Sequence, residues 1–179
     1  MKATGIVRRM DDLGRVVIPK EIRRTMRIRE GDPLEIYTAS DGEVIFKKYS
    51  PMGELSTLAV QFAEVLNRSI GAPVLITDRD HVIAVCGASK RELLERRVAP
   101  ELEELMEGRK TYEAKDGAAA LYPLLGFSKA ALVALPIIGA GDVSGSVLLL
   151  EQDEKTLPSA EDKKLMQIAS AFLGKQTEE

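Results

Sequence analysis

Apolar and polar residues alternate in short runs over the first fifty positions, which is the pattern of half-buried strands. A turn at residues 11–14 separates the first two runs, and Asp41-Gly42, a type I′ hairpin signal, separates the last two. The pattern predicts strands over residues 4–10, 15–18, 34–38 and 43–48. Two hairpins are therefore expected in this segment.

A short helix is expected between the two hairpins. Pro19 follows the second run, and proline suits the first position of a helix because its φ is already fixed. The predicted helix extends to about Arg27, with Ile22 and Met26 facing inward because they are four residues apart. Its outer faces then carry mainly basic side chains.

Longer apolar periods begin after residue 53. Apolar residues recur at helical spacing over 55–66, and Gly71 is a typical helix end. A last helix is expected from Ser159, its N-cap, with Asp162 at the third position, and residues 89–108 are expected to be helical in pieces. Strands are predicted over 74–77, 82–86, 132–138 and 143–150, with no assignment for 112–127. This part is predicted to be α+β, with central antiparallel strands.

The chain is expected to form two domains, because its composition changes near Ser50. Residues 1–53 would form the first domain and residues 54–179 the second, with 49–53 as a short linker between them. The first domain has so few large apolar side chains that it would bury too little surface to be stable alone. It is therefore expected to be an obligate homodimer.

Charge is unevenly distributed between these parts. The whole chain has a net charge of -3, but residues 1–50 hold 11 basic and 8 acidic residues, net +3. The remainder holds 14 basic and 20 acidic residues, net -6. A basic N-terminal segment on an otherwise acidic protein indicates a polyanionic partner.

Seven basic side chains are the candidate contacts to double-stranded DNA. Guanidinium groups bind phosphate or guanine through paired hydrogen bonds, and the preference for Arg over Lys favours oriented contacts. A solvated charged surface explains the charge alone about as well. Their concentration in one compact unit favours DNA binding. The candidates are Arg8, Arg9, Arg15, Lys20, Arg23, Arg24 and Arg27.

Three stretches of the first domain resemble the AbrB-type transition-state regulators. They are MKATGIVRR at residues 1–9, DLGRVVIPKEIRRT at 12–25 and GDPLEIY at 31–37. The resemblance implies an all-β swapped-hairpin barrel in which two chains interleave. It also implies principal DNA contacts at Arg8, Arg15, Arg23 and Arg24, with Arg9 contributing.

Within that family the chain looks more like a forespore regulator of endospore formers, which also carries a second domain of this length. This resemblance implies activation or repression of sporulation genes. The second domain itself resembles the GAF sensory domains, since Pro136-Ile137 followed by Gly141, Gly145 and Leu148 is similar to their late hairpin. It implies a pocket for an unidentified small molecule. We also expect this domain to join dimers into a tetramer.

Other chemistries find little support in the sequence. His81 and Cys86 are the only residues of their kinds, which excludes a His/Cys metal cluster within one chain. Residues 139–145 lack the spacing of a phosphate-binding loop. No metal, cofactor or catalytic activity is therefore expected.

The expected location is the cytoplasm. One cysteine is too few for an intramolecular disulfide, and no apolar leader follows Met1. The longest uncharged stretch of the C-terminal half, residues 130–141, is shorter than the roughly 20 residues that span a bilayer. No membrane segment is expected.

Two alternatives to a transcriptional regulator remain open at this stage. The first is an antitoxin, an AbrB-like DNA-binding dimer with a partner-binding C-terminal domain. Such tails are short and extended, whereas this one has the apolar periodicity of a folded domain. The second is an enzyme or ligand-binding protein whose basic segment binds nucleic acid incidentally.

Overall fold

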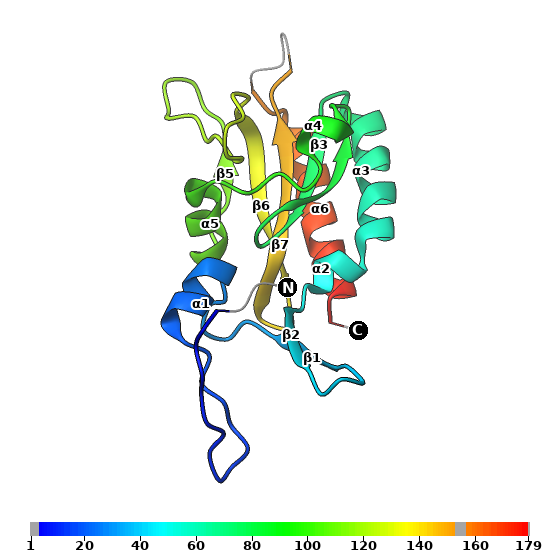
Figure 1. Ribbon diagram of the computed structural model, residues 1–179. Coiled ribbons are helices and arrows are strands. Elements are labelled where there is room, and N and C mark those ends of the chain that lie inside the picture. Colours follow the sequence, from blue (N-terminus) through cyan, green and yellow to red (C-terminus); the bar gives the residue numbers. More distant parts are fainter. Residues whose placement is uncertain (1–3, 153–156, 179) are drawn as a thin grey trace. The chain divides into compact units, whose positions relative to one another are not determined.

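The computed structural model describes residues 4–152 and 157–178 (Figure 1). The first three residues of the AbrB-like stretch at 1–9 lie outside the described part. Contacts within the chain divide it into two compact units, with the division between Tyr49 and Ser50. Each unit is described by itself.

The first unit contains one helix and one hairpin. Helix α1 (Lys20–Met26) is followed by strands β1 (Leu34–Thr38) and β2 (Val44–Lys48), which pair antiparallel with Ile36 opposite Phe46. The predicted helix and the predicted second hairpin are thus confirmed. The helix begins one residue late, because Pro19 is its N-cap rather than its first residue.

Two details of the first unit differ from the sequence prediction. Residues 4–10 and 15–18 form no strand in the described single chain, although the turn between them is present. The β1–β2 turn is not type I′, because that type needs positive φ at two central residues and only Gly42 has one (φ +87°). Its hydrogen bonds, Gly42 N to Ala39 O and Ala39 N to Glu43 O, define a longer loop around a type I turn.

The second unit is built on a five-stranded antiparallel sheet with the strand order β4-β3-β7-β6-β5. The predicted strands are confirmed, and β5 is an addition in the unassigned segment. The strands are β3 (Val74–Asp78), β4 (Val82–Cys86), β5 (Tyr112–Glu113), β6 (Ala131–Gly139) and β7 (Asp142–Leu150).

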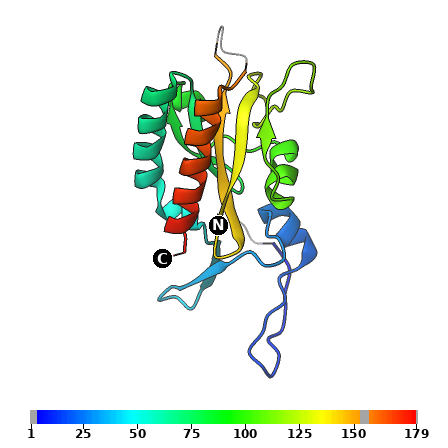
Figure 2. The same ribbon diagram turned by 180° about the vertical axis from the view of Figure 1, so that it is seen from behind.

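Helices cover one face of this sheet, and shorter helices and loops cover the other (Figures 1 and 2). Neighbouring residues of a strand point to opposite faces, so Val74 and Ile76 enter one core while Leu75 enters the other. The first core packs under α3 (Ser56–Ile70) and α6 (Ala160–Gln176); the second packs under α4 (Lys90–Leu93), α5 (Pro100–Glu107) and the loop after β5.

Local signals explain where the two long helices begin and end. Gly71 ends α3 in the left-handed conformation, and Ser159 caps α6 through a capping box with Asp162, both as predicted. The prediction of a linker over residues 49–53 is wrong in one respect. Residues Pro51–Glu54 form a helical turn, α2, and the side chain of Met52 is fully buried in the first core.

Candidate nucleic-acid interface

The candidate DNA contacts lie on two segments of the first unit. Arg8, Arg9 and Arg15 belong to the excursion around the turn at 11–14, and Lys20, Arg23 and Arg24 belong to α1. All six are exposed. The seventh candidate, Arg27, is half-buried.

Asp11 organises the turn that presents Arg15. Its Oδ1 accepts hydrogen bonds from the backbone N–H groups of Leu13 (3.0 Å) and Arg15 (2.8 Å), and its Oδ2 accepts one from Arg15 Nε (2.7 Å). These bonds to Arg15 and Leu13 lower the pKa of the Asp11 carboxyl, because they favour its charged form. The ion pair fixes the guanidinium at Nε and leaves its two amino groups for another acceptor.

Helix α1 places its basic side chains on one surface. Lys20 lies three and four residues before Arg23 and Arg24, so the three side chains share one side of the helix. Arg23 and Arg24 lie in the last turn, where a positive charge interacts favourably with the helix dipole. The helix has no buried residue, so Ile22 is only half-buried and Met26 is exposed.

The C-terminal end of α1 is hydrogen-bonded to the β1–β2 hairpin. Arg27 is left-handed (φ 51°) and its backbone N–H bonds to the carbonyls of Arg23 and Arg24. Lys48 Nζ on β2 donates to the Arg27 carbonyl (2.9 Å) and lies 3.7 Å from Asp32 Oδ2. These contacts fix the helix on β2, which makes Lys48 a structural residue of the interface.

Asp11 and Lys48 are not among the site residues predicted from the sequence. The spacing of Asp11 and Arg15 could have revealed the ion pair, because a turn that returns after four residues brings such side chains together. Nothing local signals Lys48, which acts on a residue 21 positions earlier in the chain.

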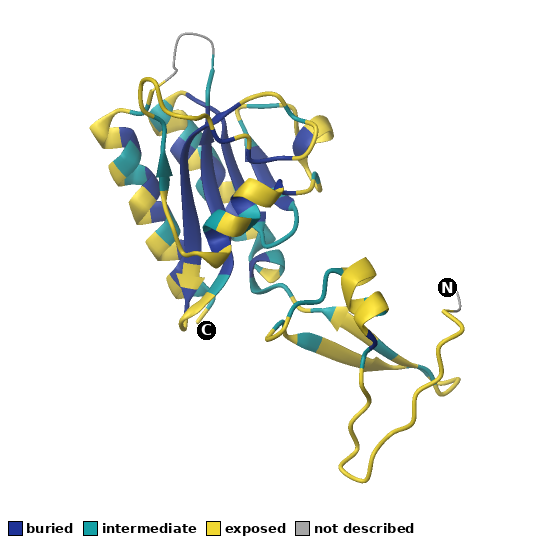
Figure 3. Ribbon diagram, turned by 90° about the vertical axis from the view of Figure 1, so that its left-hand side faces the viewer, coloured by how far each residue is buried: buried dark blue, intermediate teal, exposed yellow. Residues whose placement is uncertain are grey.

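The first unit leaves most of its apolar side chains uncovered in a single chain (Figure 3). Val7 is 87% exposed and Val17 is 72% exposed, whereas the second unit buries two full clusters. Exposed apolar surfaces of this kind are typical of interaction sites. The exposed apolar residues of the first unit are Ile6, Val7, Met10, Leu13, Val16, Val17, Met26, Ile36, Tyr37, Val44, Phe46 and Tyr49.

Other site types are not found in the described part of the chain. Residues 4–152 and 157–178 hold no group of three or more His, Cys, Asp or Glu side chains that could bind a metal ion. The helices within these ranges are all too short or too polar to cross a membrane. Cys86 is half-buried, with its Sγ 3.5 Å from Asn67 Oδ1.

A small unit with a surface of exposed arginines, joined to an α+β unit, defines a DNA-binding transcriptional regulator. Residues 54–178 match the family described as "Stage V sporulation protein T C-terminal, transcription factor". The chain belongs to this family. Residues 7–53 match a second family, described as "Antidote-toxin recognition MazE, bacterial antitoxin".

Individual relatives agree with this assignment. The chain is 47% identical over 180 residues to stage V sporulation protein T of Bacillus subtilis (strain 168), and the match covers 100% of both proteins. It is 63% identical over 51 residues to the transition state regulatory protein AbrB of the same organism, covering 28% of this chain and 52% of that protein.

The second unit has the fold of GAF domains. The GAF domain/HD domain protein from Geobacter sulfurreducens matches with a TM-score of 0.55 at 14% identity, over 70% of this chain and 93% of that one. The predicted mixed fold, an AbrB-like first domain and an α+β GAF-like second domain, is therefore confirmed.

Proposed function

We propose that this regulator controls sporulation genes in the forespore by binding double-stranded DNA through the basic side chains of its first domain. The observation that carries the proposal is the set of exposed arginines on two segments of a unit that is 63% identical to the transition state regulatory protein AbrB over 51 residues. The contacts would be Arg8, Arg9, Arg15, Lys20, Arg23 and Arg24. Arg27, half-buried at the end of α1, would contribute least.

The DNA-binding form would be a dimer through residues 1–53. Two interleaved first units would cover the exposed valines of the excursion and bring two sets of arginines to one surface. The same pairing would explain why residues 4–10 and 15–18 have the alternating sequence of strands but form no strand within one chain. Their strand partners would come from the second chain. The domain boundary after residue 53 remains part of this proposal.

Dimers would join into tetramers through the outer surface of α3 and α6, which lie side by side on the sheet (Figure 2). Val65 is 58% exposed and Ile168 52% exposed on these helices. Phe62 and Phe172 stack beside them with their ring centroids 5.0 Å apart. An apolar surface across two helices fits a second copy of the same surface, because such an interface is self-complementary.

The chain would act as a cytoplasmic regulator without catalytic activity, metal or cofactor. A second candidate, an antitoxin, is favoured by the antitoxin family match at residues 7–53. The transcription-factor family match at 54–178 covers the larger part of the chain and favours regulation. Co-purification of a toxin with the full chain would favour the antitoxin instead.

The salt dependence of DNA binding tests the proposal. Each phosphate neutralised by a basic side chain releases counterions, so log affinity should fall linearly with log salt with a slope of about -0.9 per contact. The affinity for a sporulation promoter is measured by fluorescence anisotropy titration at several salt concentrations. We expect a steep linear decrease of log affinity with log salt. Affinity that does not change with salt would contradict the proposal.

A further inference from the structure

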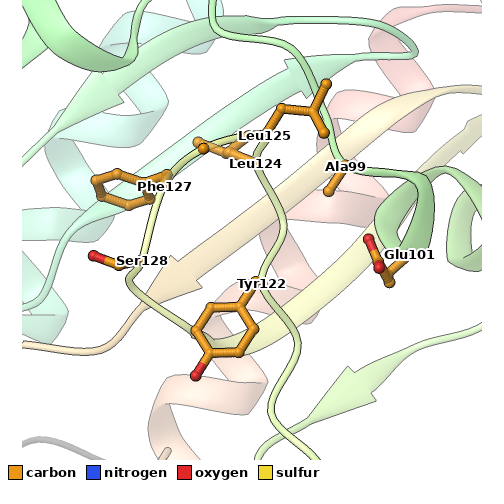
Figure 4. Close-up of a pocket in the computed structure, with 8 residues that line it drawn as sticks. Ala99, Glu101, Tyr122, Leu124, Leu125, Phe127 and Ser128 are labelled. Atoms are coloured by element: carbon orange, nitrogen blue, oxygen red, sulfur yellow. The ribbon is translucent and has the colours of Figure 1, made fainter.

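Two carboxylates of this chain lie in contrasting surroundings. Glu101, on α5 of the second unit, is exposed beside a hollow of about 370 Å³ (Figure 4), which is the usual state of a carboxylate. Asp32, in the arginine-rich first unit, has a side chain that is only 4% exposed. A carboxylate is buried in this way where neighbouring groups pair its charge and donate hydrogen bonds to it. The surroundings of Asp32 therefore indicate a structural task.

Asp32 and Lys48 act together on the residues that follow α1. Oδ2 of Asp32 accepts a hydrogen bond from Arg29 N (2.8 Å) and lies 3.7 Å from Lys48 Nζ. Lys48 Nζ in turn donates to the Arg27 carbonyl (2.9 Å), and its side chain is 25% exposed. The ammonium group is thus directed to a carbonyl and a carboxylate of its own unit. Because the two side chains carry opposite charges, the pair adds no net charge to the DNA-binding surface.

The Arg27 carbonyl belongs to the turn that ends α1. Arg27 is left-handed (φ 51°), which is unfavourable for a residue with a Cβ. The N–H groups of Arg27 and Ile28 donate to the carbonyls of Arg24 (3.3 Å) and Arg23 (2.8 Å). These are the bonds of a Schellman motif, in which glycine is the usual left-handed residue. The bond from Lys48 therefore stabilises a helix end that Arg27 itself disfavours.

We propose that Asp32 and Lys48 are positioning residues for DNA binding, which hold the end of α1 so that Arg23 and Arg24 are presented together. The proposal rests on the proposed function and deepens it, because neither positioning residue would contact DNA. Arg23 and Arg24 supply the carbonyls of the motif, so unwinding of the last turn displaces both guanidinium groups. The apparent DNA affinity falls in proportion to the fraction of molecules that keep this turn.

A positioning role and a direct effect of charge give opposite predictions. Loss of a phosphate contact weakens binding and lowers the salt slope by about 0.9. Loss of an acidic side chain near DNA tightens binding, because it removes a repulsion from the phosphates. Substitution of either positioning residue should instead weaken binding and leave the salt slope unchanged, since the number of phosphate contacts stays the same.

The lysine is tested in the full chain by fluorescence anisotropy titration of a promoter duplex at several salt concentrations. Lys48→Met keeps the aliphatic stem, removes the ammonium group and should weaken binding by about fivefold, with the slope of the wild type. Lys47→Met, its exposed neighbour on β2, is the control and should stay within about twofold of the wild type. A slope lower by about 0.9 in Lys48→Met, or an equal loss of affinity in the two variants, would overturn the proposal.

The aspartate gives the sharper test, because its charge has the sign of DNA. Asp32→Asn should weaken binding by about threefold, the order of a modest ion pair, although it removes a negative charge. Glu30→Gln is the control at an exposed position two residues earlier, and it should bind DNA at least as tightly as the wild type. Binding by Asp32→Asn that is as tight as that of the wild type, or tighter, would overturn the role of Asp32.

A combined variant shows whether Lys48 acts through the two arginines. At low salt, where weak complexes still form, Lys48→Met is added to a chain that already carries Arg23→Ala and Arg24→Ala. The further loss of affinity should be less than about twofold, because residues that act through one another are not additive. A full fivefold loss on this background would mean that Lys48 acts independently, against the proposal.

Hydrogen exchange of the unbound chain tests the same contacts without DNA. The Ile28 amide, which bonds to the Arg23 carbonyl, should exchange about fivefold faster in Lys48→Met and Asp32→Asn than in the wild type. The NMR signals of Ile36 and Phe46 should stay in place, because the hairpin is intact. Unchanged exchange at Ile28, or loss of the hairpin signals, would overturn the positioning role.

This exchange measurement also separates the two possible failures. If the wild-type chain did not bind DNA, the proposed function would fall together with the positioning role that rests on it. The exchange rates would still show whether Asp32 and Lys48 hold the end of α1. If the wild type bound DNA with the expected salt dependence and the variants bound equally well, only the positioning role would fall.

Discussion

At the scale of single residues, Asp11 shows how one side chain prepares a contact surface. It receives two backbone N–H groups of its own turn and the Nε of Arg15. Without these bonds the turn would lose three of its polar contacts, and Arg15 would sample many rotamers. A carboxylate among basic side chains is therefore explained by the order that it gives to the arginine.

The pKa of Asp11 is a direct measure of this role. Its pKa in the folded chain lies below the ordinary value of 3.8, chiefly because of the Arg15 backbone N–H and then the Arg15 side chain. The bonds therefore contribute stability above pH 3.8 that is lost as the pH falls through the lower, folded-state pKa. NMR titration of the Asp11 carboxyl should show its midpoint below 3.8.

Arg15→Gln separates the two causes. It removes the guanidinium but keeps the backbone N–H, so the Asp11 pKa should rise and still remain under 3.8. A midpoint at or above 3.8 in the wild type would contradict the arrangement.

At the scale of elements, the packing of α6 on β6 depends on a close approach of two backbones. A Cβ added at Gly174 would lie 2.1 Å from Ile138 O, and one added at Gly139 would lie 2.3 Å from Gly174 O. Both positions therefore require glycine, because the backbones of α6 and β6 approach each other too closely at these two points to admit a Cβ.

Replacing Gly174 by Ala should destabilise the chain, although alanine favours helix. The added methyl group forces α6 away from the strand, at a cost of about 1–3 kcal/mol, the usual range for overpacking. Urea denaturation measures the change. Gln167→Ala, an exposed position on the same helix, is the control and should change stability by less than about 0.5 kcal/mol. Equal stability of the two variants would contradict the packing.

The same scale shows what the sequence could predict. Regular apolar periods and local caps identified α3, α6 and the long strands, because these signals lie within each element. The short strand β5 and the irregular loop after it escaped prediction, because their bonds go to β6 and to residues 97–99. The buried Met52 was taken for part of a linker, since four residues of helix are too few to show a period.

In the candidate site too, features that depend on local sequence could be predicted, and features that depend on distant contacts could not. The basic residues and their clustering are visible in the sequence, as is the exposed surface of α1. The half-buried state of Arg27 is not, because it arises from a left-handed helix end and from Lys48 on a distant strand.

At the scale of the whole molecule, the contrast between the two units predicts how the chain assembles. Val7 and Val17 are highly exposed in one chain, so a charge at these positions would cost little in a monomer. In an interleaved dimer they would be covered. Val7→Asp combined with Val17→Asp should therefore reduce tetramers to dimers that are held through the second unit alone, as measured by analytical ultracentrifugation.

The control for this experiment is Ser40→Asp, an exposed position in the β1–β2 loop. It should leave the mass unchanged. An unchanged oligomeric state of the double valine variant would contradict dimerisation through this surface.

The second association surface makes a separate prediction. Val65→Asp with Ile168→Asp should reduce tetramers to dimers and leave the dimers able to bind DNA, because the two surfaces belong to different units. Light scattering after size exclusion measures the mass. Tetramers that persist in this variant would place the second contact elsewhere.

The central claim is that the arginines of the first unit bind DNA, and alanine substitution tests it most directly. Arg15→Ala and Arg24→Ala, each compared with Lys129→Ala on the second unit, are titrated with a sporulation promoter over a range of salt. Each arginine variant should lose about 1–3 kcal/mol of binding free energy, or reduce the salt slope by about one, while remaining as oligomeric as the wild type. If both arginine variants bound the promoter as the wild type and Lys129→Ala do, the account of this surface would be wrong.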